Sequence, residues 1–148
     1  MRTLWIVSAF VLSVVAAQTA SAAEVVVEML NRDKATNTMN VFKPGLVKVA
    51  KGDTVKWVAT NPGHNVAFVP GGVPAGVPAF SSGYTKEITY KFDKPGIYVY
   101  KCTPHFGMGM VGLVVVGNDK SNLAAAKAAF VPPLAKKRLE PLFAELAK

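Results

Sequence analysis

Short apolar stretches separated by turn-forming residues recur through most of the chain and predict an all-β sandwich. Strands favour β-branched and aromatic residues, and their side chains point alternately to the two faces of a sheet. In residues 54–58 this period of two places Val55 and Trp57 on one face and Lys56 on the other. Stretches of this kind are residues 25–30, 46–49, 54–58, 65–69, 87–92, 97–102 and 111–116.

After residue 117 the pattern changes from strand to helix. Residues 122–130 are rich in alanine, and residues 134–147 have apolar side chains at helical spacing. Two prolines at 132 and 133 separate the two predicted helices, and Pro141 is expected to kink or restart the second one. We expect this helical tail, at about 121–147, to pack an apolar stripe on the sandwich. A helix lying on a membrane surface is the alternative, because three basic residues occur together at 136–138.

The first 23 residues have the composition of a secretory signal peptide. Arg2 precedes an apolar run, residues 4–17, which is too short to span a membrane. Small residues over 20–23 fit the cleavage pattern. The remaining residues, 24–148, are enough for one domain with one core.

The mature chain is basic. Without Arg2, 16 Lys and Arg side chains against 9 Asp and Glu give a formal charge of +7, which suits an acidic partner surface. The lysines are scattered, so binding to nucleic acid is not indicated. No later apolar run approaches the roughly 18 residues of a membrane span. We therefore expect an exported protein without a stable membrane association.

The candidate chemistry lies in one nine-residue run and one distant histidine. Cys102 is the only cysteine, and His105 and two methionines, Met108 and Met110, follow it. His64 is the only other histidine. A thiolate, two imidazoles and a weak axial thioether are the ligands of a blue copper electron-transfer site. The sequence therefore predicts one copper ion bound by Cys102, both histidines and one of the methionines.

Two neighbouring residues are expected to tune this site. Pro104 has no N–H and cannot donate a hydrogen bond to the thiolate of Cys102. Fewer donors leave more charge on the sulfur and favour Cu(II), which lowers the reduction potential. Asn65 follows His64, and we expect its backbone N–H to reach the sulfur and its side chain to brace the ligand loop. An asparagine in an ordinary turn is the alternative.

These residues resemble those of the pseudoazurins, a family of the cupredoxins. The resemblance covers nearly the whole mature chain, and its motifs lie at residues 29–31, 52–55, 63–66 and 101–110. The His-to-Met spacing of the family favours Met110 over Met108 as the axial ligand. Plastocyanins share this spacing but end soon after the last strand, and amicyanins have a shorter loop. The helical tail therefore favours the pseudoazurins.

The resemblance implies an eight-stranded, cupredoxin-like Greek-key β-sandwich with two C-terminal α-helices. It also implies a periplasmic electron carrier, often donating electrons to a copper nitrite reductase in denitrification. We expect a monomer that donates electrons to a copper nitrite reductase or another periplasmic reductase. Its expected partners are redox proteins, among them copper nitrite reductase and c-type cytochromes. By the family pattern, electrons pass through the exposed edge of His105, across an apolar patch ringed by lysines.

The chain departs from the family in one stretch. Residues 61–85 contain no charged side chain, whereas family members usually carry lysines there. Electrostatic steering would then depend on Arg32, Lys34, Lys101 and more remote charges. This departure weakens the expectation of a strongly electrostatic interface with a nitrite reductase, but it leaves the copper site unchanged.

Two other functions compete with a one-electron carrier. A periplasmic copper chaperone or store would expose labile copper on a surface rich in thioethers or paired thiols, whereas this chain places one thiolate with two imidazoles between strands. An enzyme could use Cys102 as nucleophile and His105 as base. No third orienting group is evident, and the residues after Phe106 indicate no substrate pocket. A carrier, and not an enzyme, is therefore favoured.

Overall fold

The computed structural model describes residues 22–146. The predicted signal peptide lies outside the described residues except for its last two positions, so it stays a prediction together with the domain boundary. Within 22–146, none of the helices has the length and apolar character needed to cross a membrane.

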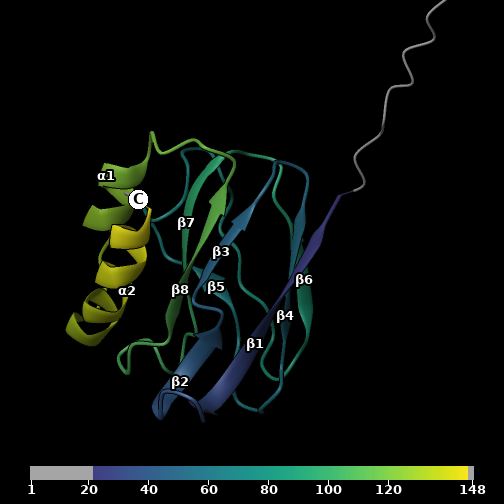
Figure 1. Cartoon of the computed structure of the whole chain (residues 1–148), viewed down its shortest axis with the longest axis vertical. Coiled ribbons are helices and arrows are strands. Elements are labelled where there is room, and N and C mark those ends of the chain that lie inside the picture. The colour runs from purple at the N-terminus through teal and green to yellow at the C-terminus, as the bar shows by residue number, and fades with distance from the viewer. Residues whose placement is uncertain (1–21, 147–148) are drawn as a thin grey trace, which may run out of the picture.

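The described residues form two four-stranded sheets that pack into a sandwich (Figure 1), followed by two helices. The first sheet contains, in spatial order, β2 (Thr38–Lys43), β1 (Glu24–Asp33), β4 (Thr54–Val58) and β6 (Ile88–Lys91). The second contains β3 (Leu46–Val49), β8 (Val111–Val116), β7 (Gly96–Lys101) and β5 (Ala67–Phe68). Eight strands with a C-terminal helical pair confirm the predicted cupredoxin-like fold.

The space between the sheets is filled by aromatic and valine side chains. Trp57 packs edge-on against Tyr100 with ring centroids 5.2 Å apart, and Phe42 does the same at 4.8 Å. Val55 and Trp57 are both fully buried, as the alternation in the sequence predicted. Large aromatic residues remove much apolar surface from water, so their burial here stabilises the sandwich.

One strand, β2, is missing from the stretches that the apolar pattern marks. Its inward positions are Asn40 and Phe42, and a buried polar residue interrupts the alternation. Asn40 also has a φ of 50°, in the left-handed region. The β1–β2 ladder runs from Glu28 to Asp33 but has no pair at Asn31 and Asn40. This break in the ladder and the buried polar residue explain why the alternation of apolar and polar residues did not predict β2.

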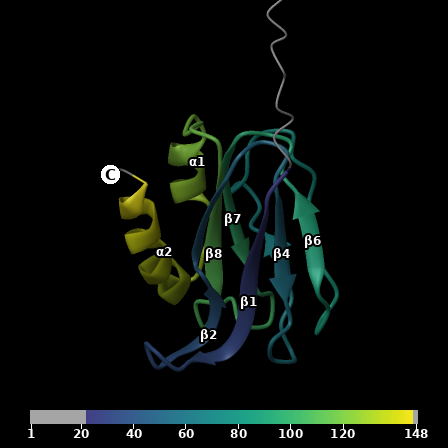
Figure 2. The same ribbon diagram turned by 45° about the vertical axis from the view of Figure 1, so that its right-hand side comes forward.

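Two helices, α1 (Leu123–Ala128) and α2 (Pro133–Glu145), cover the outer face of the second sheet (Figures 1 and 2). The buried side chains of α2 form one cluster with those of β7 and β8, as predicted for the tail. Burial on both faces accounts for the unbroken apolar run of β8. α2 continues through Pro141 instead of restarting there. Pro141 is exposed, so water can bond to the carbonyl that its missing N–H leaves free.

Candidate metal centre

The four predicted ligands lie at one end of the sandwich, on loops whose ends are fixed by strands. Cys102 directly follows β7 and Met110 directly precedes β8, and these two strands are paired along their whole length. The backbone N–H of Cys102 donates to the carbonyl of Met110 at 3.0 Å and closes the loop between them. His64 comes from the connection between β4 and β5, next to Gly63 with a φ of 87°.

Three ligand atoms form a compact triangle. Nδ1 of His64 and Nδ1 of His105 are 3.0 Å apart. Cys102 Sγ lies 3.7 Å from the first nitrogen and 3.4 Å from the second. The centre of such a triangle is about 2.0 Å from each corner, close to ordinary metal–nitrogen and metal–sulfur bond lengths of about 2.0–2.3 Å. The donor set therefore fits one metal ion, and its chemistry is that of the trigonal plane of blue copper.

His64 is held by a residue that the sequence analysis did not assign to the site. Its Nε2–H donates to Oδ1 of Asn31 at 2.8 Å, which leaves Nδ1 free to bind a metal. Burial lowers the pKa of His64, with a smaller contribution from nearby His105, so the ring favours the neutral form that metals require. Asn31 lies in β1, and its place in the family motif was the only signal in the sequence.

Cys102 is fully buried, and both its burial and nearby backbone N–H groups affect the ionisation of its thiol. Burial raises the pKa of the thiol, while the backbone N–H groups of Asn65 and His105 lower it by bonding to the sulfur. Pro104, between Cys102 and His105, has no N–H to contribute. Two backbone donors thus favour the thiolate, and a bound cation would favour it further.

Asn65 connects the two ligand-bearing loops. The backbone N–H of Thr103 donates to its Oδ1 at 2.7 Å, and its Nδ2 donates to the Thr103 hydroxyl at 3.2 Å. Asn65 is almost completely buried, so these bonds are shielded from water. Since Thr103 is next to Cys102 and Asn65 is next to His64, the pair fixes the position of one ligand relative to the other.

The two candidate methionines lie in different environments. Met110 is fully buried and packs in the same core cluster as Cys102. Its backbone N–H donates to the carbonyl of His105 at 3.1 Å. Met108 is 49% exposed, and its sulfur accepts a hydrogen bond from Asn40 Nδ2 at 3.6 Å. A buried thioether beside the thiolate is the better donor, so burial favours Met110 for the axial position.

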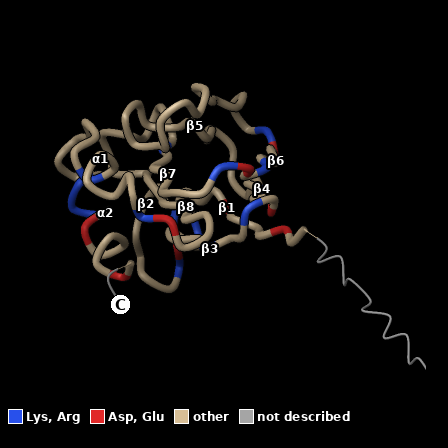
Figure 3. Tube along the Cα trace, turned by 90° about the horizontal axis from the view of Figure 1, so that it is seen from above, with Lys and Arg blue, Asp and Glu red and all other residues tan. Residues whose placement is uncertain are grey.

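The surface around His105 combines apolar side chains with few charges. His105 is partly exposed, and the residues Met39 and Met108 are each about half exposed at this end of the molecule. Lys101 lies over the ring of Phe106, with Nζ 4.5 Å from the centroid. Figure 3 shows that the trace around β5, which includes the uncharged stretch 61–85, carries neither blue nor red segments.

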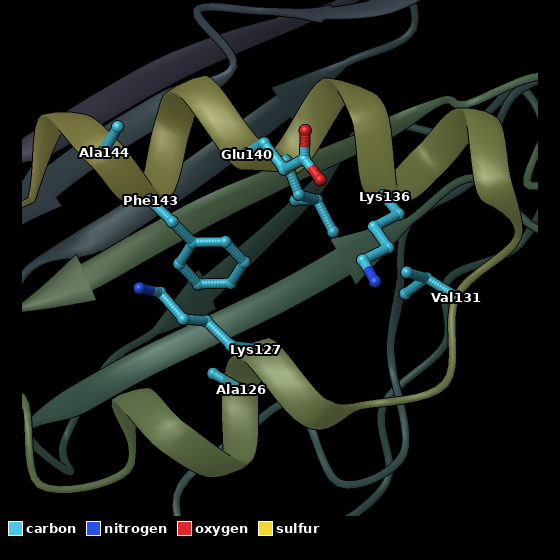
Figure 4. A pocket seen from close by; sticks show the side chains of 8 residues that line it. Ala126, Lys127, Val131, Lys136, Glu140, Phe143 and Ala144 are labelled. Atoms are coloured by element: carbon cyan, nitrogen blue, oxygen red, sulfur yellow. The ribbon is translucent and has the colours of Figure 1, made fainter.

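A separate pocket lies between the two helices of the tail (Figure 4). It is lined by Ala126, Lys127, Val131, Lys136, Leu139, Glu140, Phe143 and Ala144. None of the four proposed ligands, His64, Cys102, His105 and Met110, lines this pocket. The pocket therefore has no part in the metal centre.

Known proteins resemble this chain over most of its length. Residues 27–117 match a family model described as copper binding proteins of the plastocyanin/azurin family. Pseudoazurins from Methylorubrum extorquens and Paracoccus pantotrophus are 46% and 44% identical to it. These alignments cover 86% and 82% of this chain and 84% and 81% of the relatives. The crystal structure of pseudoazurin from Methylobacterium extorquens AM1 has a TM-score of 0.79 at 46% identity, covering 83% of this chain and 98% of that chain.

Proposed function

Since the chain belongs to the pseudoazurin family of copper-binding electron carriers, we propose that it carries single electrons between redox proteins of the periplasm through a type 1 (blue) copper centre. The observation that supports this most directly is the donor triangle of one sulfur and two nitrogens with sides of 3.0, 3.4 and 3.7 Å. The proposed ligands are His64, Cys102, His105 and, in the axial position, Met110.

When bound, copper supplies the one-electron couple, with Cu(I) favouring soft sulfur and Cu(II) favouring nitrogen ligands. The chain contributes a mixed donor set that suits both states. Asn31 holds the His64 ring, and Asn65 holds the loop that begins with Cys102. Because these supports are protein hydrogen bonds, the donors need to move little when the oxidation state changes.

Electrons are proposed to enter and leave through the partly exposed ring of His105. The half-exposed residues Met39 and Met108 give this end a small apolar surface that a partner can cover. Arg32 lies at its edge and donates to the Met39 sulfur at 3.1 Å. The predicted signal peptide and the family support the proposed periplasmic location. A copper nitrite reductase or c-type cytochromes are the proposed partners.

The metal assignment is tested by the colour of the copper-loaded protein. Oxidised protein should absorb intensely in the visible range through thiolate-to-Cu(II) charge transfer, and ascorbate should bleach it. Cys102→Ser should abolish the colour. A wild-type Cu(II) complex without this colour would contradict the carrier and would favour a copper chaperone or store.

The axial assignment is tested by comparing the two methionines. Met110→Leu should keep the colour and raise the reduction potential. Cu(II) loses the electron donation of its fourth ligand, whereas Cu(I) is adequately bound by the three remaining ligands, so Cu(II) is destabilised more than Cu(I). Met108→Leu is the matched control and should leave the potential close to that of the wild type. A lowered potential in Met110→Leu would contradict the assignment.

The partner is tested by the salt dependence of electron transfer. If positive charge steers the encounter, the rate constant with a copper nitrite reductase or a c-type cytochrome should fall as ionic strength rises. Lys101→Gln should weaken this dependence, whereas Lys48→Gln on β3 should not. If the electron-transfer rate constant did not change with ionic strength, the basic side chains would have no role in steering the encounter.

A further inference from the structure

Arg138, in the middle of α2, is bonded to the main chain of two other segments. Its Nη1 donates to the carbonyls of Asn40 at 2.8 Å and Gly109 at 3.0 Å, and its Nη2 donates to the carbonyl of Met39 at 2.9 Å. Arg138 forms no ion pair within residues 22–146. Carbonyl oxygens of β2 and of the ligand loop are therefore its partners.

These carbonyls belong to places where the backbone is unusual. Asn40 has a φ of 50° and Gly109 a φ of 82°, both in the left-handed region. A non-glycine residue in this region is strained by about 1 kcal/mol or more, so it persists only where its surroundings hold it. A Cβ on Gly109 would lie 3.0 Å from Cδ and Nε of Arg138 and 3.1 Å from the carbonyl of Leu134. Glycine is thus required for this close approach of α2 to the loop.

The bond to Gly109 acts on the peptide group that joins Gly109 to Met110. The carbonyl of this group accepts from Arg138 at 3.0 Å, and its N–H donates to the carbonyl of His105 at 3.1 Å. Both ends of the peptide are therefore held, and its plane cannot rotate without breaking a hydrogen bond. Since Met110 begins at this peptide, its orientation determines where the Met110 side chain starts.

A guanidinium is suited to this task because it is planar and presents several N–H groups in a fixed fork. The bond to Met39 and the bonds to Asn40 and Gly109 come from its two terminal nitrogens. A lysine could supply the same charge, but only from a single ammonium group. Geometry and charge can therefore be separated by substitution.

We propose that Arg138 is a positioning residue that couples the helical tail to the ligand loop by fixing the Gly109–Met110 peptide, and thereby sets the place of the axial thioether. The consequence for copper rests on the function proposed above. The hold on the peptide does not, because it consists of protein contacts alone. The tail is then part of the metal centre as well as a cover for the second sheet.

The test uses amide hydrogen exchange in metal-free protein, which needs no copper chemistry. In Arg138→Lys and Arg138→Gln, the Met110 amide should exchange at least tenfold faster than in the wild type, relative to core amides such as Tyr98 and Val114. Lys137→Gln, which removes one charge from the next position of α2, should leave the Met110 amide unchanged. If Arg138→Gln fails to fold, the milder Arg138→Lys still decides the outcome.

The copper-loaded proteins give a second readout. Both Arg138 variants should shift the reduction potential and the ratio of the visible absorption bands. Lys137→Gln should change neither of these two quantities. An unchanged Met110 amide in both Arg138 variants would overturn the proposal. A lysine variant that matches the wild type would assign the effect to charge and would also overturn it. If the copper-loaded protein were colourless while the Met110 amide exchanged faster in the Arg138 variants, the copper assignment would be contradicted and the positioning role of Arg138 would stand.

Discussion

Replacing Asn31 by alanine is expected to weaken copper binding, although Asn31 is not a proposed ligand. The side chain of Asn31 accepts a hydrogen bond from Nε2 of the buried His64 at 2.8 Å. This bond selects the tautomer in which Nδ1 is free to face Cys102 and His105. Without it, both tautomers become accessible, and copper binding must restore the correct one.

The size of the effect follows from the strength of that bond. A neutral hydrogen bond contributes about 0.5–1.5 kcal/mol net, and every 1.4 kcal/mol is about tenfold in affinity. Removing the outer hydrogen-bond partner of a metal-bound histidine typically lowers affinity about 10–100-fold. Asn31 itself is exposed, so water can partly replace its amide. We therefore expect copper affinity to fall by about tenfold, at the lower end of this range.

The assay is competition for Cu(I) against a chromophoric chelator without oxygen. Asn31→Asp is the informative partner variant, because a carboxylate keeps the acceptor and makes the imidazole more electron-rich. Its affinity should be retained and its reduction potential lowered. Asn118→Ala, in the exposed turn after β8, is the control. If Asn31→Ala bound copper within twofold of the wild type, the tautomer explanation would be refuted.

Three further predictions concern stability. In Gly112→Ala the new Cβ would lie 2.4 Å from the phenol of Tyr100, so chemical denaturation should show a loss of about 1–3 kcal/mol, whereas Gly45→Ala, with its nearest neighbour at 3.6 Å, should be close to neutral. Asn122→Ala removes two hydrogen bonds to the backbone of Ile97, at 2.9 and 2.8 Å, and should lower the free energy of unfolding by about 1–3 kcal/mol in the same assay. Removing copper with a chelator should lower the midpoint of thermal unfolding in calorimetry, because free ligand at 1,000 times its Kd stabilises a fold by about 4 kcal/mol.

Those parts of the fold that depend on local periodicity were predictable. The alternation around Val55 and Trp57 identified β4 and its buried face, and the apolar spacing in the tail identified α2. The ligand loop was equally legible, because Cys102 and Met110 lie at the ends of two paired strands. In each case the information lies within one short, continuous stretch of sequence.

Contacts between distant segments were not predictable in the same way. Asn31 and His64 are 33 positions apart, and Arg138 and Met39 are 99 apart. Whether such side chains meet depends on strand register and on how α2 lies against the sheets, which no local pattern encodes. Asn40 shows the converse problem, since a polar residue at an inward position concealed β2. In the structure, the side-chain amide of Asn40 donates a hydrogen bond to the Met108 sulfur at 3.6 Å.

The supports of the donor set come from three elements that are far apart in the sequence. Asn31 of β1 is hydrogen-bonded to His64. Asn65, in the β4–β5 connection, is hydrogen-bonded to Thr103. Arg138 of α2 is hydrogen-bonded to Gly109. Each support is a hydrogen bond between protein atoms, so none of them depends on the charge of the metal. The donor atoms should therefore keep their separations in both oxidation states, and a small reorganisation energy is the expected result. A fold with a separate helical tail gains one such support that a sandwich alone would lack.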